Sequence, residues 1–148
     1  MQKEFLPYVR LVEFLGKVLG RHTEVVLHDL TNLDQSIIAI ANGHISGRKV
    51  GAPATDLALR IVSNEALKQK DYLCKYTGYA KNGYKLCSST FFIRDGSERL
   101  IGMLCINTDS ERLEQARDIL DSMLSDRDCC CQNGATEDIS EKLPLNAE

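Results

Sequence analysis

Two turn signals separate three strand-like runs in the second half of the chain, and they constrain the fold more than any other feature. Asn82-Gly83 joins the run 72–81 to the run 84–93, and Asp95-Gly96 leads into a third run, 100–107. Asn-Gly between such runs is a strong hairpin signal, because both residues accept the positive φ angles of a tight turn. The pattern predicts three consecutive antiparallel strands.

A two-residue loop at Asn82-Gly83 also predicts a register. It places Cys74 opposite Phe91 and Cys87 opposite Gly78. In the second hairpin, Arg94 faces either Ser97 or Arg99, and both choices keep the same parity of faces. One sheet face then combines these polar and apolar side chains: Thr77, Tyr79, Ser88, Thr90, Cys105, Asn107, Leu73, Leu86, Phe92, Ile101 and Met103. The polar side chains of this face are either solvated or hydrogen-bonded to nearby backbone. Alternatively, they line a polar ligand pocket.

The first half of the chain predicts a helix and a further hairpin. Apolar residues recur at helical spacing over 5–19, and Gly20 follows where a C-cap residue would lie. A short strand over 24–30 and an isoleucine-rich strand ending near Asn42 flank a polar turn. A further helix begins at 53–55 and continues toward Ala66.

The chain continues with a last helix and a polar tail. Thr108 to Glu111 matches a capping box, and the apolar stripe that follows extends to about Ser125. Packing of this helix on its own sheet is favoured, with dimerisation as an addition. The order of elements predicts an α+β domain with a five-stranded antiparallel sheet over 1–125, followed by a linker or disordered tail over 126–148.

Composition limits the classes of function. The 148 residues include 43% hydrophobic residues, enough for one buried core. The net charge is −3, whereas a domain that binds nucleic acid through its phosphates usually has a basic surface. No run approaches the roughly 20 apolar residues of a membrane span, and there is no signal-peptide pattern, so a cytoplasmic protein is expected.

The six cysteines do not form a recognisable disulfide or zinc pattern. They are Cys74, Cys87, Cys105 and the run Cys129-Cys130-Cys131, with no CxxC pair. The predicted register brings no two strand cysteines together, so reduced, buried thiols are expected. No ligand cluster selects a metal, haem or flavin, and no cofactor is predicted.

The segment 37–56 is a strand that breaks into a glycine-rich polar loop. His44, Ser46 and Arg48 lie among Gly43, Gly47 and Gly51. Loops placed on a rigid strand often bind ligands, but the glycines also suit a purely structural connection. Both roles fit, although the spacing matches no nucleotide-binding pattern.

Four strings, VVLHDL (25–30), SIIAIANGHISGRKVGAPATDLAL (36–59), SSTFFIRD (88–95) and LIGMLCIN (100–107), resemble the YheO-like PAS domain of bacterial transcriptional regulators. The resemblance covers 5–124. It implies a PAS fold, a five-stranded antiparallel sheet with short helices on one face and flanking terminal helices. It also implies DNA binding only through a helix-turn-helix region C-terminal to this chain.

The family pattern further implies a set of candidate ligand-binding residues. They are His28, Asp29, Asn42, His44, Arg48, Ser88, Ser89, Thr90 and Asn107, with Gly43 and Gly47 in the loop.

Three functions remain open at this point. The first is a sensory domain that binds a small polar or anionic metabolite at Arg48 and His44 and forms a homodimer or higher homo-oligomer. The second is a ligand-free dimerisation module. The third is an enzyme, suggested by His28-Asp29 and by His44 near Ser46, but adjacency alone does not establish an oriented base and nucleophile. His28 fits a core histidine better than a catalyst.

Overall fold

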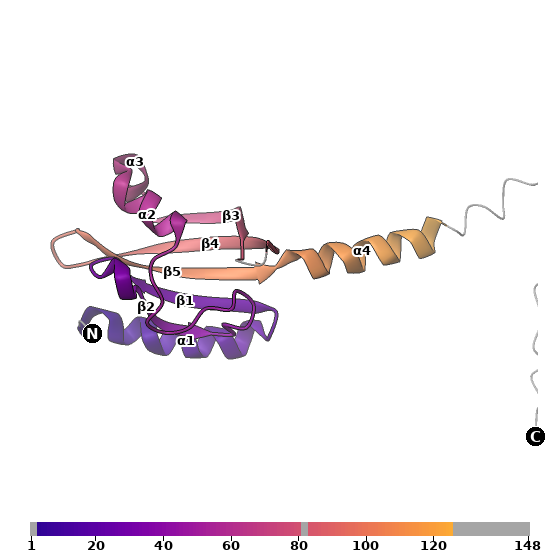
Figure 1. The fold of residues 1–148 in the computed structure, drawn as a ribbon, viewed down its shortest axis with the longest axis horizontal. Helices are drawn as coiled ribbons and strands as arrows, with labels where there is room; N and C mark the ends of the chain where they lie inside the picture. Colours follow the sequence, from indigo (N-terminus) through magenta and orange to yellow (C-terminus); the bar gives the residue numbers. More distant parts are fainter. Residues whose placement is uncertain (1–2, 81–82, 126–148) are drawn as a thin grey trace, which may run out of the picture. The chain divides into compact units, whose positions relative to one another are not determined.

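The computed structural model describes residues 3–80 and 83–125. A five-stranded antiparallel sheet with the strand order β2-β1-β5-β4-β3 forms its centre (Figure 1). The strands are β1 (Thr23–Asp29), β2 (Ile37–Ala41), β3 (Tyr72–Tyr79), β4 (Lys85–Arg94) and β5 (Leu100–Asp109). The predicted α+β class, the three hairpins and the five strands are confirmed.

Helical segments precede, separate and follow the strands along the chain. They are η1 (Lys3–Phe5), α1 (Leu6–Leu19), η2 (Leu33–Gln35), α2 (Asp56–Ser63), α3 (Glu65–Lys68) and α4 (Ser110–Ser125). The chain divides into two units after Leu113, so the sheet, α1 to α3 and the first turn of α4 belong to the first unit. No helix in the described ranges is long and apolar enough to cross a membrane.

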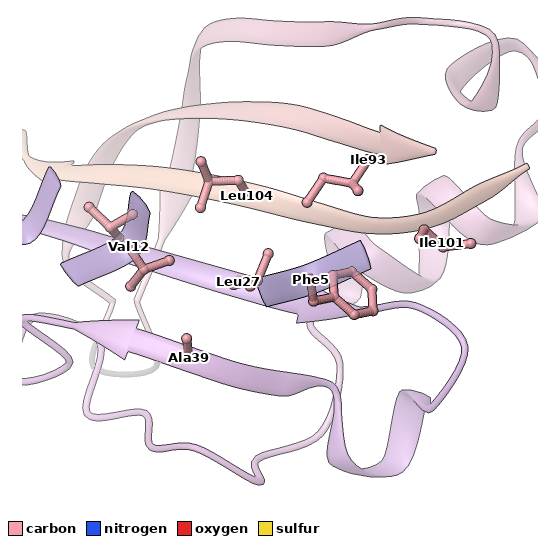
Figure 2. Packing of buried hydrophobic residues seen from close by; sticks show 8 residues of the cluster. Phe5, Val12, Leu27, Ala39, Ile93, Ile101 and Leu104 are labelled. Atoms are coloured by element: carbon pink, nitrogen blue, oxygen red, sulfur yellow. The ribbon is translucent and has the colours of Figure 1, made fainter. Parts of the chain in front are cut away.

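Helix α1 covers one face of the sheet along β1 and β2 (Figure 1). Pro7 lies in its first turn, and Gly20 ends it with a φ of 77°. Phe5 and Val12 pack against side chains of the strands, and Figure 2 shows this cluster from close by. The strand residues of the cluster are Val25, Leu27, Ala39, Ile93, Ile101 and Leu104.

Helix α2 covers the opposite face, which is called the inner face below. Thr55 caps this helix by accepting a hydrogen bond from Ala58 N, and Ala58 and Ile61 are buried. They pack with side chains from β1, β2, β4 and β5, namely Val26, Ile37, Phe92, Met103 and Cys105. The predicted helix toward Ala66 is interrupted at Asn64, whose side chain caps the separate α3.

The register of the β3–β4 hairpin differs from the prediction by one residue. Ala80 N donates to Tyr84 O, and Gly83 N donates to Ala80 O. The loop therefore has three residues rather than two, and Gly83 has a φ of 84°. Asn82 itself lies outside the described residues.

The shifted register changes the partners of several β3 residues. Cys87 pairs with Thr77 instead of Gly78. A bulge between Leu73 and Tyr76 moves the register again, so that Phe91 faces Tyr72 and not Cys74. Thr77 and Tyr79 therefore face away from the inner face, whereas the prediction placed them on it.

The β4–β5 hairpin contains a second bulge, at Ile93/Arg94. Arg94 pairs with Leu100, so neither Ser97 nor Arg99 is its partner. This bulge explains why Ile101 packs in the α1 cluster instead of facing inward.

The three described cysteines are free, but only Cys105 is buried. The prediction of buried thiols was wrong for Cys74 and Cys87. Cys87 lies on the face that α1 covers only along β1 and β2, so this part of β4 is exposed. Cys129 to Cys131 and the predicted tail lie outside the described residues.

Strand β5 extends two residues further than expected, and this moves the start of the last helix. Thr108 bonds to Thr23 through its hydroxyl group, and Asp109 Oδ1 accepts from Arg112 N at 3.3 Å. Asp109 therefore caps α4 in place of Thr108. Within the described residues no side chain of α4 is buried, so its packing on a sheet stays a prediction.

Candidate functional site

The inner face brings together polar side chains that lie far apart in the sequence. Glu24 pairs with Asn107, Val26 with Cys105 and His28 with Met103 across β1 and β5. Side chains of paired residues point to the same face, so the face continues into Ser88 and Thr90 of β4. Ser88 and Thr90 are buried, so the expectation that this face is solvated does not hold at these residues.

Glu24 is the centre of a buried polar network. Its side chain is 0% exposed. Oε1 accepts from Asn107 Nδ2 at 3.0 Å, while Oε2 accepts from the backbone N of Ser46 at 3.3 Å and from the Ser46 hydroxyl group. One carboxyl group therefore joins β1, β5 and the glycine-rich loop.

His28 is buried and hydrogen-bonded on the same face. Ser36 Oγ donates to Asp29 O at 3.0 Å, so this hydroxyl group accepts from His28 Nδ1, also at 3.0 Å. The neutral ring consequently carries its proton on Nδ1. Burial, and secondly the nearby Arg48 guanidinium, lower the pKa of His28 to about 4.

This lowered pKa predicts acid destabilisation. Between pH 6.5 and about 4 the unfolded chain binds a proton at His28 that the folded chain does not bind, so stability falls as pH falls through this window. Each pH unit costs about 1.4 kcal/mol, which gives a loss of roughly 3 kcal/mol. Urea unfolding of the wild type and of His28→Asn from pH 7 to 4.5 measures it. The difference between the two should shrink with acidification, and parallel pH curves would contradict the prediction.

Tyr76, Thr90 and Cys105 form an uncharged hydrogen-bonded chain. Tyr76 Oη lies 2.7 Å from Thr90 Oγ1, which lies 3.3 Å from Cys105 Sγ. Burial raises the pKa of Tyr76 to about 12 and that of Cys105 to about 11. Both groups are protonated at neutral pH, so Cys105 is not an activated thiolate.

Arg48 brings a positive charge to this buried face. Its guanidinium is close enough to add to the effect of burial that lowers the pKa of His28, and to oppose in part the burial that raises the pKa of Cys105. The residue is half-buried. In the described part of the chain its side chain forms no hydrogen bond or salt bridge. A half-buried guanidinium without a partner can donate hydrogen bonds to a carboxylate or phosphate group.

Other predicted site residues have local structural contacts instead. Asp29 Oδ1 accepts from the backbone N and hydroxyl group of Thr31, so it does not orient His28. Asn42 Nδ2 donates to three carbonyl oxygens at the end of α1 and the start of β1. Ser89 Oγ accepts from Lys75 N at the β3 bulge.

His44 lies outside the inner face, in a surface pocket of about 460 Å³. The pocket is lined by Arg21, His22, His44, Ile45, Tyr84, Asp109 and Arg112. His44 Nε2 lies 3.0 Å from Arg21 O. The structure therefore separates His44 from Arg48, although the two are four positions apart.

Sequence reasoning missed Glu24, Ser36 and Tyr76. Glu24 alternates with Val26 and His28 in an otherwise apolar strand, and this period of two was an available signal. The shift of one residue in the register brings Tyr76 to the inner face, opposite Ser88. In the described ranges no three histidine, cysteine, aspartate or glutamate side chains form a metal-binding group.

Comparisons with known proteins agree with this fold. The sequence pattern of the YheO-like PAS domain matches residues 1–125. YheO of Escherichia coli K12 is 43% identical over 100 residues, which cover 68% of this chain and 42% of that protein. The transcriptional regulator DauR of Pseudomonas aeruginosa is 30% identical over 118 residues, covering 80% of this chain and 53% of DauR.

The chain thus spans about half the length of these relatives. An RNA-binding light-oxygen-voltage receptor shares the fold with a TM-score of 0.50 at 16% identity, over 84% of this chain and 39% of the receptor. Together with the strand order and the helix-covered sheet, the match over residues 1–125 identifies the chain as a member of the YheO-like PAS domain family.

Proposed function

We propose that this PAS domain is the sensory part of a bacterial transcriptional regulator, and that a small anionic metabolite binds at the inner face through Arg48. One observation carries the proposal: the half-buried Arg48 side chain has no hydrogen-bonding or ionic partner among the described residues, although it lies near buried His28 and Cys105. A carboxylate or phosphate group would provide that partner.

The position of the site supports a route for the signal. Cys105 and Asn107 reach the inner face from β5, and β5 continues into α4 at Asp109. The glycine-rich loop that carries Arg48 is bonded to β5 through Glu24. A ligand that prefers one arrangement of this loop would shift the population of states at the end of β5.

The output of the signal is proposed by analogy with DauR, a transcriptional regulator. A helix-turn-helix region C-terminal to the PAS domain in a longer protein would bind DNA, and self-association would bring two such regions together. Apolar side chains exposed on α1, including Leu11, Phe14 and Val18, support a homodimer or higher homo-oligomer.

A ligand-free dimerisation module is the second candidate function. In the described part of the chain, every buried side-chain nitrogen or oxygen atom has a hydrogen-bond partner. This completeness favours an interior that is stable without a ligand, so the two candidates require an experiment.

A ligand screen with matched variants tests the proposal. Native mass spectra of the purified protein, recorded under gentle and denaturing conditions, report the subunit number and any retained small molecule. Thermal shift measurements with a panel of carboxylates and phosphate esters then compare the wild type with Arg48→Gln and Lys49→Gln. Lys49 is the control because it is the neighbouring, exposed cation.

We expect at least one anion to stabilise the wild type and Lys49→Gln. In Arg48→Gln its Kd should rise about 10- to 100-fold, because a charge-assisted hydrogen bond contributes roughly 1.5–3 kcal/mol. A ligand-free dimer with no thermal shift across the panel would favour the dimerisation module. If the anion bound both variants with equal affinity, Arg48 would not be part of the site.

A further inference from the structure

The surface pocket around His44 joins four separate segments of the first unit. Arg21 and His22 lie between α1 and β1, and Ile45 follows β2 in the glycine-rich loop. Tyr84 precedes β4, while Asp109 and Arg112 mark the junction of β5 with α4. Its volume of about 460 Å³ is within the range of small-molecule sites.

The charges that line the pocket are predominantly positive. Asp109 is the only carboxyl group among the lining residues, and both of its oxygens are engaged by Arg112. Oδ1 accepts from Arg112 N at 3.3 Å, and Oδ2 lies 3.4 Å from Arg112 Nε. Arg21 has no side-chain partner among the residues that the structure describes. One guanidinium is therefore left uncompensated.

The polar walls of the pocket are held in place by hydrogen bonds between segments. Because a carbonyl oxygen only accepts, His44 Nε2 donates to Arg21 O at 3.0 Å. Asp109 N donates to His22 O at 3.0 Å. Ile45 packs with Ala80 and Leu86. These bonds fix the backbone of three of the four segments that surround the pocket.

We propose that this pocket binds a small dianion, a phosphorylated or dicarboxylate metabolite, at a site distinct from Arg48. Arg21 and Arg112 hold its negative groups, and the two histidines complete the polar wall. Since Arg112 also pairs with Asp109 at the first turn of α4, a bound dianion competes with Asp109 for this guanidinium. The pocket thus couples anion binding to the start of α4 without requiring a ligand at the inner face.

NMR titration of the 148-residue chain tests this proposal. Amide chemical shifts are followed during addition of inorganic phosphate in one arm and malonate in another, at constant ionic strength maintained with sodium chloride. We expect saturable shifts at 21–22, 44–45, 84 and 109–112 in at least one arm. The arm that saturates identifies a phosphate or a dicarboxylate ligand.

Four substitutions localise the binding. Arg21→Gln should raise the Kd about 10-fold or more, the loss expected for one charge-assisted contact, and His22→Gln provides a second variant in the same wall. Arg10→Gln, an exposed cation on α1, and Arg48→Gln should leave the Kd unchanged. Shifts that do not saturate in either arm, or that are the same in Arg21→Gln as in the wild type, would overturn the proposal. Loss of binding in Arg48→Gln would instead assign the anion to the inner face.

Discussion

Replacing Glu24 with alanine should lower the free energy of unfolding by about 3 kcal/mol or more. The truncated side chain would leave the Asn107 amide, the Ser46 backbone N and the Ser46 hydroxyl group without their acceptor. Each buried donor that loses its partner costs roughly 1–3 kcal/mol. Glu24 is fully buried, so water cannot replace the carboxyl group without rearrangement of the loop.

Two further variants separate hydrogen bonding from the loss of a surface charge. Glu24→Gln retains the shape but exchanges one acceptor for a donor, so its effect should be intermediate. Glu13→Ala removes an exposed carboxylate of α1 that pairs with Lys17, and it should leave stability nearly unchanged. Urea unfolding monitored by circular dichroism measures all three.

Amide hydrogen exchange of the same alanine variant reports on the glycine-rich loop. Because Glu24 bonds Ser46, the alanine variant should increase amide hydrogen exchange at 44–48 more than in the rest of the sheet unit. A variant as stable as the wild type, with unchanged exchange in this loop, would show that Glu24 does not hold the loop on the sheet.

Gly16→Ala is expected to cost about 2–3 kcal/mol, although alanine is the better helix former. A Cβ atom at Gly16 would overlap Ala41 Cβ, closer than two non-bonded carbon atoms can approach. The clash therefore forces α1 away from β2 or distorts one of them. The gain in helix propensity, up to about 1 kcal/mol, does not compensate for this overpacking.

Removing the opposing methyl group should reverse the effect. Ala41→Gly alone costs about 0.5–1 kcal/mol, because glycine weakens a strand. The double variant Gly16→Ala with Ala41→Gly relieves the contact and should be more stable than Gly16→Ala. A double-mutant cycle measured by urea unfolding gives the coupling energy. Additive effects would mean that α1 does not approach β2 this closely.

The turns and elements were largely predictable because their signals are local. Gly20 ends α1 and the turn near Gly83 joins β3 to β4, since these backbone conformations depend on a few neighbouring residues. The apolar period of α1 and the runs in β4 and β5 identified the elements to within a few residues. The α+β class followed from their order.

The register was not predictable from the same signals. A turn containing Gly83 accommodates loops of two or three residues, and the difference of one residue exchanged the faces of Thr77 and Tyr76. The bulges near Cys74 and at Ile93/Arg94 changed the parity again. Bulges depend on packing across the whole sheet, so no local sequence pattern predicted them.

The candidate site shows the same division. The sequence indicated a polar loop at 42–51 and polar residues in β4 and β5, because composition and alternation are visible in a linear pattern. Only the tertiary structure joined Glu24 to Ser46 and Asn107 and placed His44 in a different pocket from Arg48. The reason is that a local sequence determines which way a segment turns, whereas the partner of a buried polar group is decided by how distant segments pack.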